Sequence, residues 1–357
     1  MLKLNFKLNL NILKIPILAL CLLISVTSQA AIIWVGGEDF DFPIGSPVCF
    51  TTSGGLFRAG YARGAVCVYT CGNISSSVAF TAPVTSAWFS GRVWKNTAGT
   101  SVRWFGLGKY GTGNSLWVGS STANHLKIAL WKYDGTTWTQ LATETGTSLA
   151  QAAMNKIDVE LVSYGATATV NVYYNGLASA KITYTGDVTA GGATNLDDIR
   201  VSGCTSGFTE TDVSELIVST TDTRLMSAVT LAPTGAGTTN QWSGLFTDVN
   251  ELSQNDTTLI SSSVSGDKFQ CQVTDLPVTN VAIESVRVAV RAAKAGSSIG
   301  GLSPGVFTNA AVSVPAATTL PGAFINLETY YSNNPVTSSP WTPTEINALQ
   351  LNLQAAP

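Results

Sequence analysis

The feature that most constrains the fold of this chain is the alternation of apolar and polar residues in short segments. In KIDVELV (156–162), alternate positions are apolar or acidic: Ile157, Val159 and Leu161 against Asp158 and Glu160. The segment ATATVNVYY (166–174) alternates in the same way. Side chains of a strand point alternately to the two faces of a sheet, so this pattern predicts half-buried strands.

Turn signals separate these segments. Asn175-Gly176 and Asp134-Gly135 supply residues that tolerate a positive φ, and they predict tight hairpins. A later strand is predicted in 282–296, with the valines inward and the arginines outward: Val286, Val288 and Val290 against Arg287 and Arg291. Only 147–155 and 342–351 have helical spacing, and both are short. The predicted fold class is therefore all-β.

Length and composition agree with a chain of β-domains. The chain has 357 residues, enough for two domains of about 150 residues each. Charged residues make up 11%, against about 25% in an ordinary soluble domain. The formal net charge is −3 and no basic cluster is present, so nucleic-acid binding has no electrostatic basis.

The N-terminal segment is typical of a secretory signal. Lys3, Lys7 and Lys14 precede the apolar run 15–26, and small residues precede a cleavage site after Ala30. A membrane anchor is the alternative, but the run is shorter than the roughly 20 residues that a bilayer needs. We therefore predict an exported or extracellular protein with no membrane segment after cleavage.

Export bears on the cysteines that remain after cleavage. In an oxidising compartment, Cys49 would form a local disulfide with either Cys67 or Cys71. A tetrahedral metal site is disfavoured, because His125 is the only histidine and lies far from the C-x-x-x-C pair. The remaining cysteines are interpreted as small buried apolar side chains.

Two resemblances rest on longer motifs. Residues 155–224 resemble the concanavalin A-like (laminin-G-like) jelly rolls of lectins and glucanases, through VNVYYNGL, NLDDIRVSG and VSELIVS. Across 31–357 the chain is also similar to tailed-bacteriophage virion proteins, labelled tail or fibre components. The motifs that carry this second likeness are AIIWVGGEDFDFP, RAGYARGAV, SELIVSTTDTRLM and WTPTEINALQL.

The signal, the jelly-roll resemblance and the loop-rich sequence after 221–225 together predict a domain layout. Residues 1–30 are the signal, and 31–77 form an N-terminal segment that packs on the first sandwich. Residues 78–222 form the jelly roll, and 223–357 form a second, smaller β-sandwich-like domain.

An acidic motif near the end of the jelly roll raises the question of catalysis. Glu210, Asp212 and Glu215 spell E-x-D-x-x-E, as in a laminarinase-like glycosidase. Retaining glycosidases hold two carboxyl groups about 5–5.5 Å apart. Here that would require a β-bulge, because side chains otherwise alternate with period two. Thr211 and Ser214, which lie between the acids, are polar where the hydrolase motif normally has apolar residues, and the sequence around Glu210 is typical of a loop. We therefore predict no enzyme activity, with a glycoside hydrolase as the least favoured alternative.

Acidic turns are candidates for calcium. The segments 36–42 and 195–199 offer carboxylates near the loop rims, with Asp197 and Asp198 as the nearest pair. Neither segment has the spacing of an EF-hand loop, and a plain turn is the alternative. No other cofactor is expected.

Aromatic residues give the best functional signal. Trp104 and four further residues fall in strands of the first sandwich, and these four are the candidate carbohydrate-binding residues: Trp117, Trp131, Tyr133 and Trp138. A sugar face stacks on an exposed indole, although sandwich cores also use tryptophan. Both interpretations stay open for each residue.

The predicted function follows from the virion resemblance. It implies a non-catalytic structural or receptor-contacting component of a phage-like particle, partnered by copies of itself or by neighbouring virion proteins. The alternative is a secreted lectin-like protein that binds cell-surface glycans.

Overall fold

The computed structural model describes residues 31–36, 66–68, 75–95, 102–151, 153–202, 211–250, 256–296 and 299–357. Several predictions fall outside these residues or on side chains that are not described: the signal 1–30, the disulfide candidates Cys49, Cys67 and Cys71, and the acids Glu210 and Asp212. Across the described part of the chain, no helix is both long and apolar enough to cross a bilayer.

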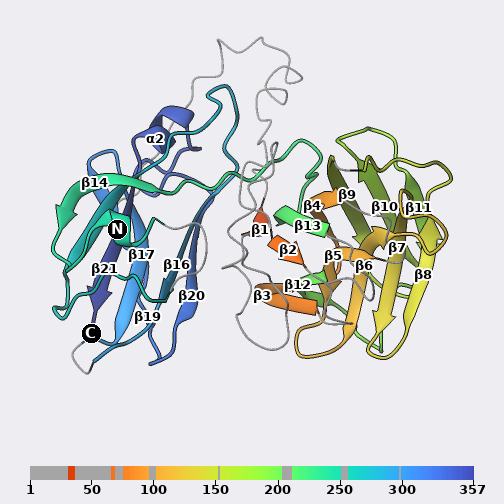
Figure 1. Cartoon of the computed structure of the whole chain (residues 1–357), viewed down its shortest axis with the longest axis horizontal. Helices are drawn as coiled ribbons and strands as arrows, with labels where there is room; N and C mark the ends of the chain where they lie inside the picture. The colour runs from red at the N-terminus through yellow and green to blue at the C-terminus, as the bar shows by residue number, and fades with distance from the viewer. Residues whose placement is uncertain are drawn as a thin grey trace, which may run out of the picture. The chain divides into compact units, whose positions relative to one another are not determined.

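The first half of the chain forms two antiparallel sheets (Figure 1). Sheet A has the order β1-β13-β4-β9-β10-β11, with β2 also beside β13. Its strands are β1 (Ile32–Gly36), β2 (Val66–Val68), β4 (Ala87–Lys95), β9 (Met154–Ser163), β10 (Ala168–Tyr174), β11 (Ile182–Gly186) and β13 (Thr211–Ser219). Sheet B has the order β3-β12-β5-β6-β7-β8. Its strands are β3 (Ser75–Val84), β5 (Arg103–Gly108), β6 (Asn114–Ser120), β7 (Ile128–Asp134), β8 (Trp138–Thr143) and β12 (Leu196–Ser202).

The alternating apolar positions form the core between sheets A and B. Ile157, Val159 and Leu161 are buried there as predicted, together with Phe89 and Trp104. Burying a large apolar side chain contributes about 1.5–3 kcal/mol, so the predicted pattern accounts for the pairing of the sheets. The all-β class and the jelly-roll sandwich are confirmed.

The second half forms two further sheets. Sheet C has the order β14-β15-β21-β17-β18, with β19 also beside β17, and sheet D pairs β16 with β20. The strands are β14 (Pro233–Asn240), β15 (Lys268–Val273), β16 (Val286–Ala292), β17 (Gly301–Thr308), β18 (Ala311–Ser313), β19 (Thr318–Thr319), β20 (Ile325–Tyr331) and β21 (Gln350–Ala356). Among the described residues of this half, two short helices accompany the strands, η3 (Phe246–Asp248) and α2 (Pro343–Asn347). As predicted, the valines face the core: Val288 is buried, and Val286 and Val290 are half-buried against it. Arg291 is partly exposed and pairs with Asp256, but the Arg287 side chain is only 6% exposed where it pairs with Glu328, so the outward prediction is wrong for Arg287.

The predicted boundary near 222 falls between β13 and β14, where no described strand spans it. The division into domains stays a prediction.

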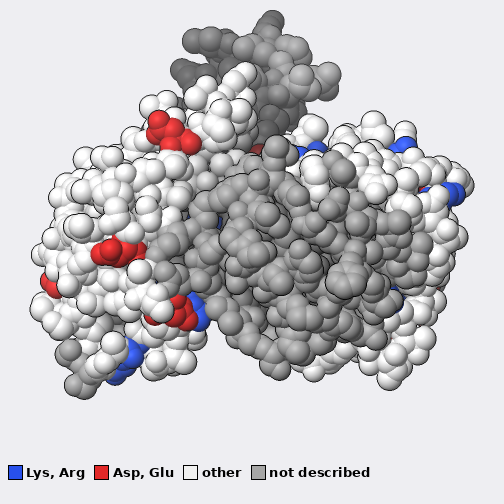
Figure 2. Space-filling model, viewed as in Figure 1, with Lys and Arg blue, Asp and Glu red and all other residues white. Residues whose placement is uncertain are grey.

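The surface of the described residues is weakly charged, and Figure 2 shows few and scattered Lys, Arg, Asp and Glu side chains on the face drawn. This agrees with the charged content of 11%.

The predicted turns are present, with longer loops than expected. Asn175 and Gly176 have φ values of 49° and 73°, as a tight turn requires, but β11 begins only at Ile182. Gly135 has a φ of 96°, and β8 begins at Trp138. The carboxylate of Asp134 accepts from the N–H groups of Thr136 and Thr137, at 2.9 and 2.7 Å, which closes that three-residue loop.

Helical spacing was misleading at 147–155. No helix is present among the described residues of this segment, and β9 already begins at Met154. The Asn155 amide exchanges hydrogen bonds with the backbone of Ala150 and donates to the carbonyl of Ala153, each at 2.9 Å. Such side-chain to backbone bonds replace helical ones. The other segment with helical spacing, 342–351, begins with the short helix α2, which Thr342 and Glu345 cap with a capping box. It ends in the strand β21, which was not predicted.

Cys271 of β15 is a free and fully buried cysteine, as interpreted from the sequence. Burial raises the pKa of its thiol to about 12, so the reactive thiolate is scarce. We expect no alkylation of Cys271 by iodoacetamide at mildly alkaline pH in the folded protein, and full alkylation in urea. Peptide mass spectrometry measures both, and labelling of Cys271 before unfolding would contradict its burial.

Candidate functional site

The four aromatic residues predicted to bind sugars meet in one cluster on the outer face of sheet B. The aromatic cluster consists of Trp117 of β6, Trp131 and Tyr133 of β7, Trp138 of β8 and Arg103 of β5. Their strand neighbours Leu116, Val118 and Leu130 belong to the core between the sheets. Because side chains alternate along a strand, the aromatic residues point away from that core.

The guanidinium group of Arg103 lies between two indoles. Its central carbon is 4.8 Å from the centroid of the Trp131 ring and 4.1 Å from that of Trp138. Tyr133 stacks on Trp138 with the ring centroids 4.5 Å apart, and Trp117 meets Trp138 edge to face at 5.6 Å. Cation–π contacts contribute about 0.5–2 kcal/mol each, so these contacts stabilise the arrangement of the side chains in the cluster.

The cluster has a buried base and a partly exposed rim. Trp117 and Trp131 are 1% and 3% exposed, whereas Tyr133 and Trp138 are half-buried. The indole N–H of Trp117 donates to Ser115 Oγ at 2.6 Å, and that of Trp131 donates to the carbonyl of Ser120 at 3.2 Å. Trp117 and Trp131 are therefore packed as buried residues. Of the four candidates, only Tyr133 and Trp138 are exposed enough to form a platform for a sugar. Trp104 belongs to the main core.

A buried ion pair supports the same face of sheet B. Arg200 of β12 binds Asp198 with two hydrogen bonds of 2.8 Å. It also donates to the carbonyls of Lys109, Thr112 and Gly113, at 2.7, 2.9 and 3.0 Å. Arg200 therefore fixes the turn between β5 and β6. A Cβ atom at Gly108 would lie 2.0 Å from Arg200 Nε, so only glycine leaves room for this side chain.

The two calcium candidates lie within this ion-pair system. Both oxygens of Asp198 accept from Arg200, and burial raises the pKa of its carboxyl despite that contact. Asp197 pairs with Lys109 and accepts from the backbone N–H of Tyr110 at 2.6 Å. Among the described residues, no group of three or more His, Cys, Asp or Glu side chains could hold a metal ion. A calcium site at Asp197 and Asp198 stays a prediction.

The outer face of sheet A is occupied by the chain itself. Residues 220–228, here called the exit segment, follow β13 and bind to this face. Lys156 of β9 donates to the carbonyls of Thr223 and Arg224, at 2.6 and 2.8 Å. Its Nζ also lies 3.0 Å from Oδ1 of Asp158, which accepts from the Thr223 hydroxyl at 2.8 Å.

Burial shifts both groups of this pair away from the charged form. Asp158 is 0% exposed and Lys156 8% exposed. Burial raises the pKa of the Asp158 carboxyl and lowers the pKa of the Lys156 ammonium group, while their mutual attraction opposes both shifts. The sequence placed Asp158 on the polar face of a strand, but it carried no signal that the exit segment buries this residue together with Lys156.

A second aromatic pair lies under the exit segment. Trp88 of β4 and Tyr173 of β10 stack with their centroids 5.5 Å apart, and the guanidinium of Arg224 lies over both rings, at 5.5 and 4.7 Å. Arg224 is held by Asp222 through a salt bridge of 2.6 Å. This pair is therefore already covered by an internal cation.

The acidic motif does contain a bulge, at Glu215. The register of β13 against β4 shifts between Ser214 and Ile217, and Glu215 has a φ of 49°. The sequence had given no sign of this bulge. Glu215 is 3% exposed and its Oε2 accepts from Arg92 Nε at 2.8 Å. Arg92 also donates to Ser227 Oγ of the exit segment at 3.2 Å. Glu215 thus anchors an arginine that contacts the exit segment.

Arg103 and Arg200 are the residues of this site that the sequence did not indicate. Each is an isolated arginine in a strand, and only the pairing of β5 with β6 and with β12 brings them to the face that carries the aromatic residues. His125 lies in the turn before β7 and outside the cluster.

Comparisons with known proteins complete the description. No protein-family model matches the sequence, and no curated protein matches it significantly. Among solved structures, a carbohydrate-binding module of Bacillus subtilis is 10% identical over 42% of this chain and 83% of its own, with a TM-score of 0.31. A homodimeric agglutinin from chicken liver is 12% identical over 41% of this chain and 99% of its own, with a TM-score of 0.29.

A third similar structure is domain 4 of an extracellular arabinanase of Geobacillus stearothermophilus in complex with arabinotriose. It is 16% identical over 55% of this chain and 83% of its own, with a TM-score of 0.27. These TM-scores are too low to support an argument, so the fold rests on the sheet order and the function on the site.

Proposed function

We propose that this chain is a non-catalytic carbohydrate-binding protein that contacts sugars through the outer face of sheet B. The observation that carries the proposal is the aromatic cluster, in which the partly exposed Tyr133 and Trp138 are stacked on each other and backed by Arg103. Sugars pack their C–H faces on aromatic side chains, and a rigid platform loses little conformational entropy on binding.

Two further observations support this choice of face. On sheet A the guanidinium of Arg224 lies over both stacked rings, Trp88 and Tyr173, whereas on sheet B Arg103 lies over Trp138 and, among the described contacts, not over Tyr133. Glu215 is buried and ion-paired with Arg92, and a carboxylate held ionised by an arginine is disfavoured as a proton donor. The tail or fibre role predicted from motif resemblance draws no support from the site or from the comparisons, and it stays a prediction, as does export.

The two stacked aromatic pairs provide a matched test. On a glycan array, Trp138→Ala is expected to weaken sugar binding at least about tenfold, because it removes the platform. Trp88→Ala removes an equally large stacked side chain from the other sheet and is expected to leave binding unchanged. Circular dichroism checks that both variants fold. Equal losses in both variants, or a loss in Trp88→Ala alone, would overturn the assignment to sheet B.

A further inference from the structure

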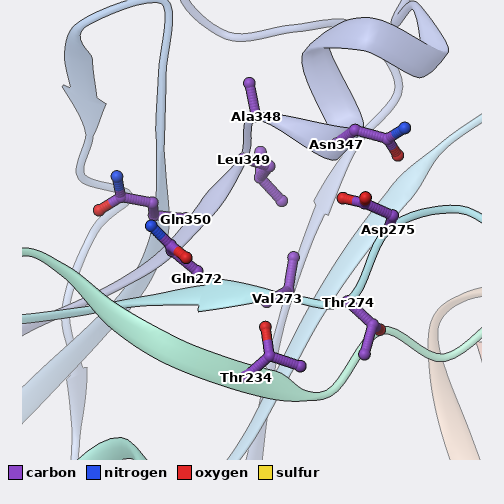
Figure 3. A pocket seen from close by; sticks show the side chains of 9 residues that line it. All are labelled: Thr234, Gln272, Val273, Thr274, Asp275, Asn347, Ala348, Leu349 and Gln350. Carbon is purple, nitrogen blue, oxygen red and sulfur yellow. The ribbon is translucent and has the colours of Figure 1, made fainter.

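A pocket in the second half of the chain combines polar side chains with an apolar floor. Its volume is about 520 Å³, within the range of small-molecule sites. It lies where β14, β15 and the junction of α2 with β21 come together (Figure 3). The lining residues are Thr234, Gln272, Val273, Thr274, Asp275, Asn347, Ala348, Leu349 and Gln350.

The polar groups stand on two sides of the pocket. Asp275 and Asn347 lie together on one side and Gln272 and Gln350 on the other, with Val273 and Leu349 between them (Figure 3). Gln272 and Gln350 are register partners on β15 and β21. A flat ligand that lies on the apolar centre would find Asp275 and Asn347 at one end and the Gln272 amide at the other, because the Gln350 amide is bound to Thr238.

Several of these polar side chains are held in place by the backbone. Asn347 Oδ1 accepts from the N–H of Leu276 at 2.9 Å, which leaves its NH₂ group to donate. Gln350 is held by Thr238 through both ends of its amide: Oε1 accepts from the Thr238 N–H at 2.8 Å and Nε2 donates to the Thr238 hydroxyl at 3.0 Å. Thr274 Oγ1 accepts from the N–H of Ala232 at 3.2 Å and keeps its own hydroxyl proton. Such preorganised groups lose little freedom when a ligand binds.

The charge of the lining selects the class of ligand. Asp275 is the one ionisable side chain among the nine lining residues, and it is exposed. No cation in the lining would compensate a phosphate or carboxylate, so anions are disfavoured. A carboxylate beside amide and hydroxyl groups suits a ligand with two neighbouring hydroxyl groups. Asp275 would accept a hydrogen bond from one of these hydroxyl groups, and Asn347 would donate a hydrogen bond to the other.

We infer that this pocket is a second binding site, for a neutral sugar in its pyranose form. The sugar lies with its apolar face on Val273 and Leu349, and its hydroxyl groups bond to Asp275, Asn347 and Gln272. The site uses no aromatic residue and shares no side chain with the aromatic cluster, so it does not depend on the function proposed for sheet B.

Saturation-transfer NMR on the full chain tests the inference. The probes are glucose, galactose, mannose, xylose and N-acetylglucosamine, and the protein carries Trp138→Ala so that sheet B contributes least. At least one sugar is expected to receive saturation. Adding Asp275→Ala is expected to weaken its binding about tenfold, as for the loss of a charged hydrogen bond. Asp275→Asn keeps one acceptor oxygen and is expected to cost about threefold or less.

The matched control is Glu284→Ala, which removes a carboxylate outside the pocket and is expected to leave binding unchanged. Absence of transfer to every sugar, or equal binding with and without Asp275→Ala, would overturn the inference. Binding of glucosamine without binding of any neutral sugar would overturn the assignment of a neutral ligand. Each of these results leaves the glycan-array comparison of Trp138→Ala and Trp88→Ala unaffected, so the two proposals fail separately.

Discussion

Replacing Lys156 with methionine is expected to lower the free energy of unfolding by about 3–5 kcal/mol, as measured by urea denaturation. The substitution leaves Asp158 in a fully buried site without its cation, which lies 3.0 Å away in the wild-type protein. It also removes the donor to the carbonyls of Thr223 and Arg224. The exit segment should therefore detach more easily from sheet A.

The pH dependence of this variant has a defined sign. Burial already raises the pKa of Asp158, and loss of the lysine raises it further. The folded variant then binds a proton more tightly than the unfolded chain does. Its stability is consequently higher below the raised pKa and falls as the pH rises through it. The deficit relative to the wild-type protein should shrink on acidification.

Two control variants distinguish the effect of leaving the Asp158 carboxylate unpaired from the general effect of removing a lysine. Lys132→Met removes a lysine from an exposed pair with Asp187 and is expected to cost no more than about 1 kcal/mol. The double variant Lys156→Met/Asp158→Leu removes both buried charges and is expected to recover part of the loss. A deficit in Lys156→Met no larger than that of Lys132→Met would show that the buried pair is unimportant.

Replacing Arg200 with methionine is expected to have a similar effect, about 3–5 kcal/mol. Arg200 is 4% exposed and Asp198 0% exposed, so the change leaves a buried carboxylate unpaired. The carbonyls of Lys109, Thr112 and Gly113 lose their donor as well. The turn 109–113 borders the aromatic cluster, because a Cβ at Gly113 would lie 3.1 Å from the Tyr133 ring. Sugar binding should therefore weaken together with stability.

The chain contains a matched control with the same spacing. Asp222 and Arg224 repeat the Asp-x-Arg arrangement of Asp198 and Arg200, but they are 42% and 24% exposed at their side chains. Arg224→Met is expected to cost about 1–2 kcal/mol, from a solvated ion pair and cation–π contacts. Similar losses in Arg200→Met and Arg224→Met would contradict the importance of burial at Asp198.

Local pattern predicted several of the strands and failed where local and tertiary preferences conflict. KIDVELV gave the core face of β9 correctly, because alternation depends only on the geometry of one strand. Helical spacing at 147–155 was overruled by the Asn155 amide, which holds the backbone in another conformation. The strand β21 was missed because its alternation follows directly on a helical signal, and its place between β15 and β17 depends on distant partners.

The candidate site shows the same division. Sequence alone determined an all-β chain and named Trp117, Trp131, Tyr133 and Trp138, since strand periodicity and residue type are local properties. Only the tertiary structure decided that these residues share an outer face with Arg103, and that the outer face of sheet A is covered by the exit segment. Burial on the polar face of a strand depends on segments far away in the chain, and no periodicity within the strand can encode it.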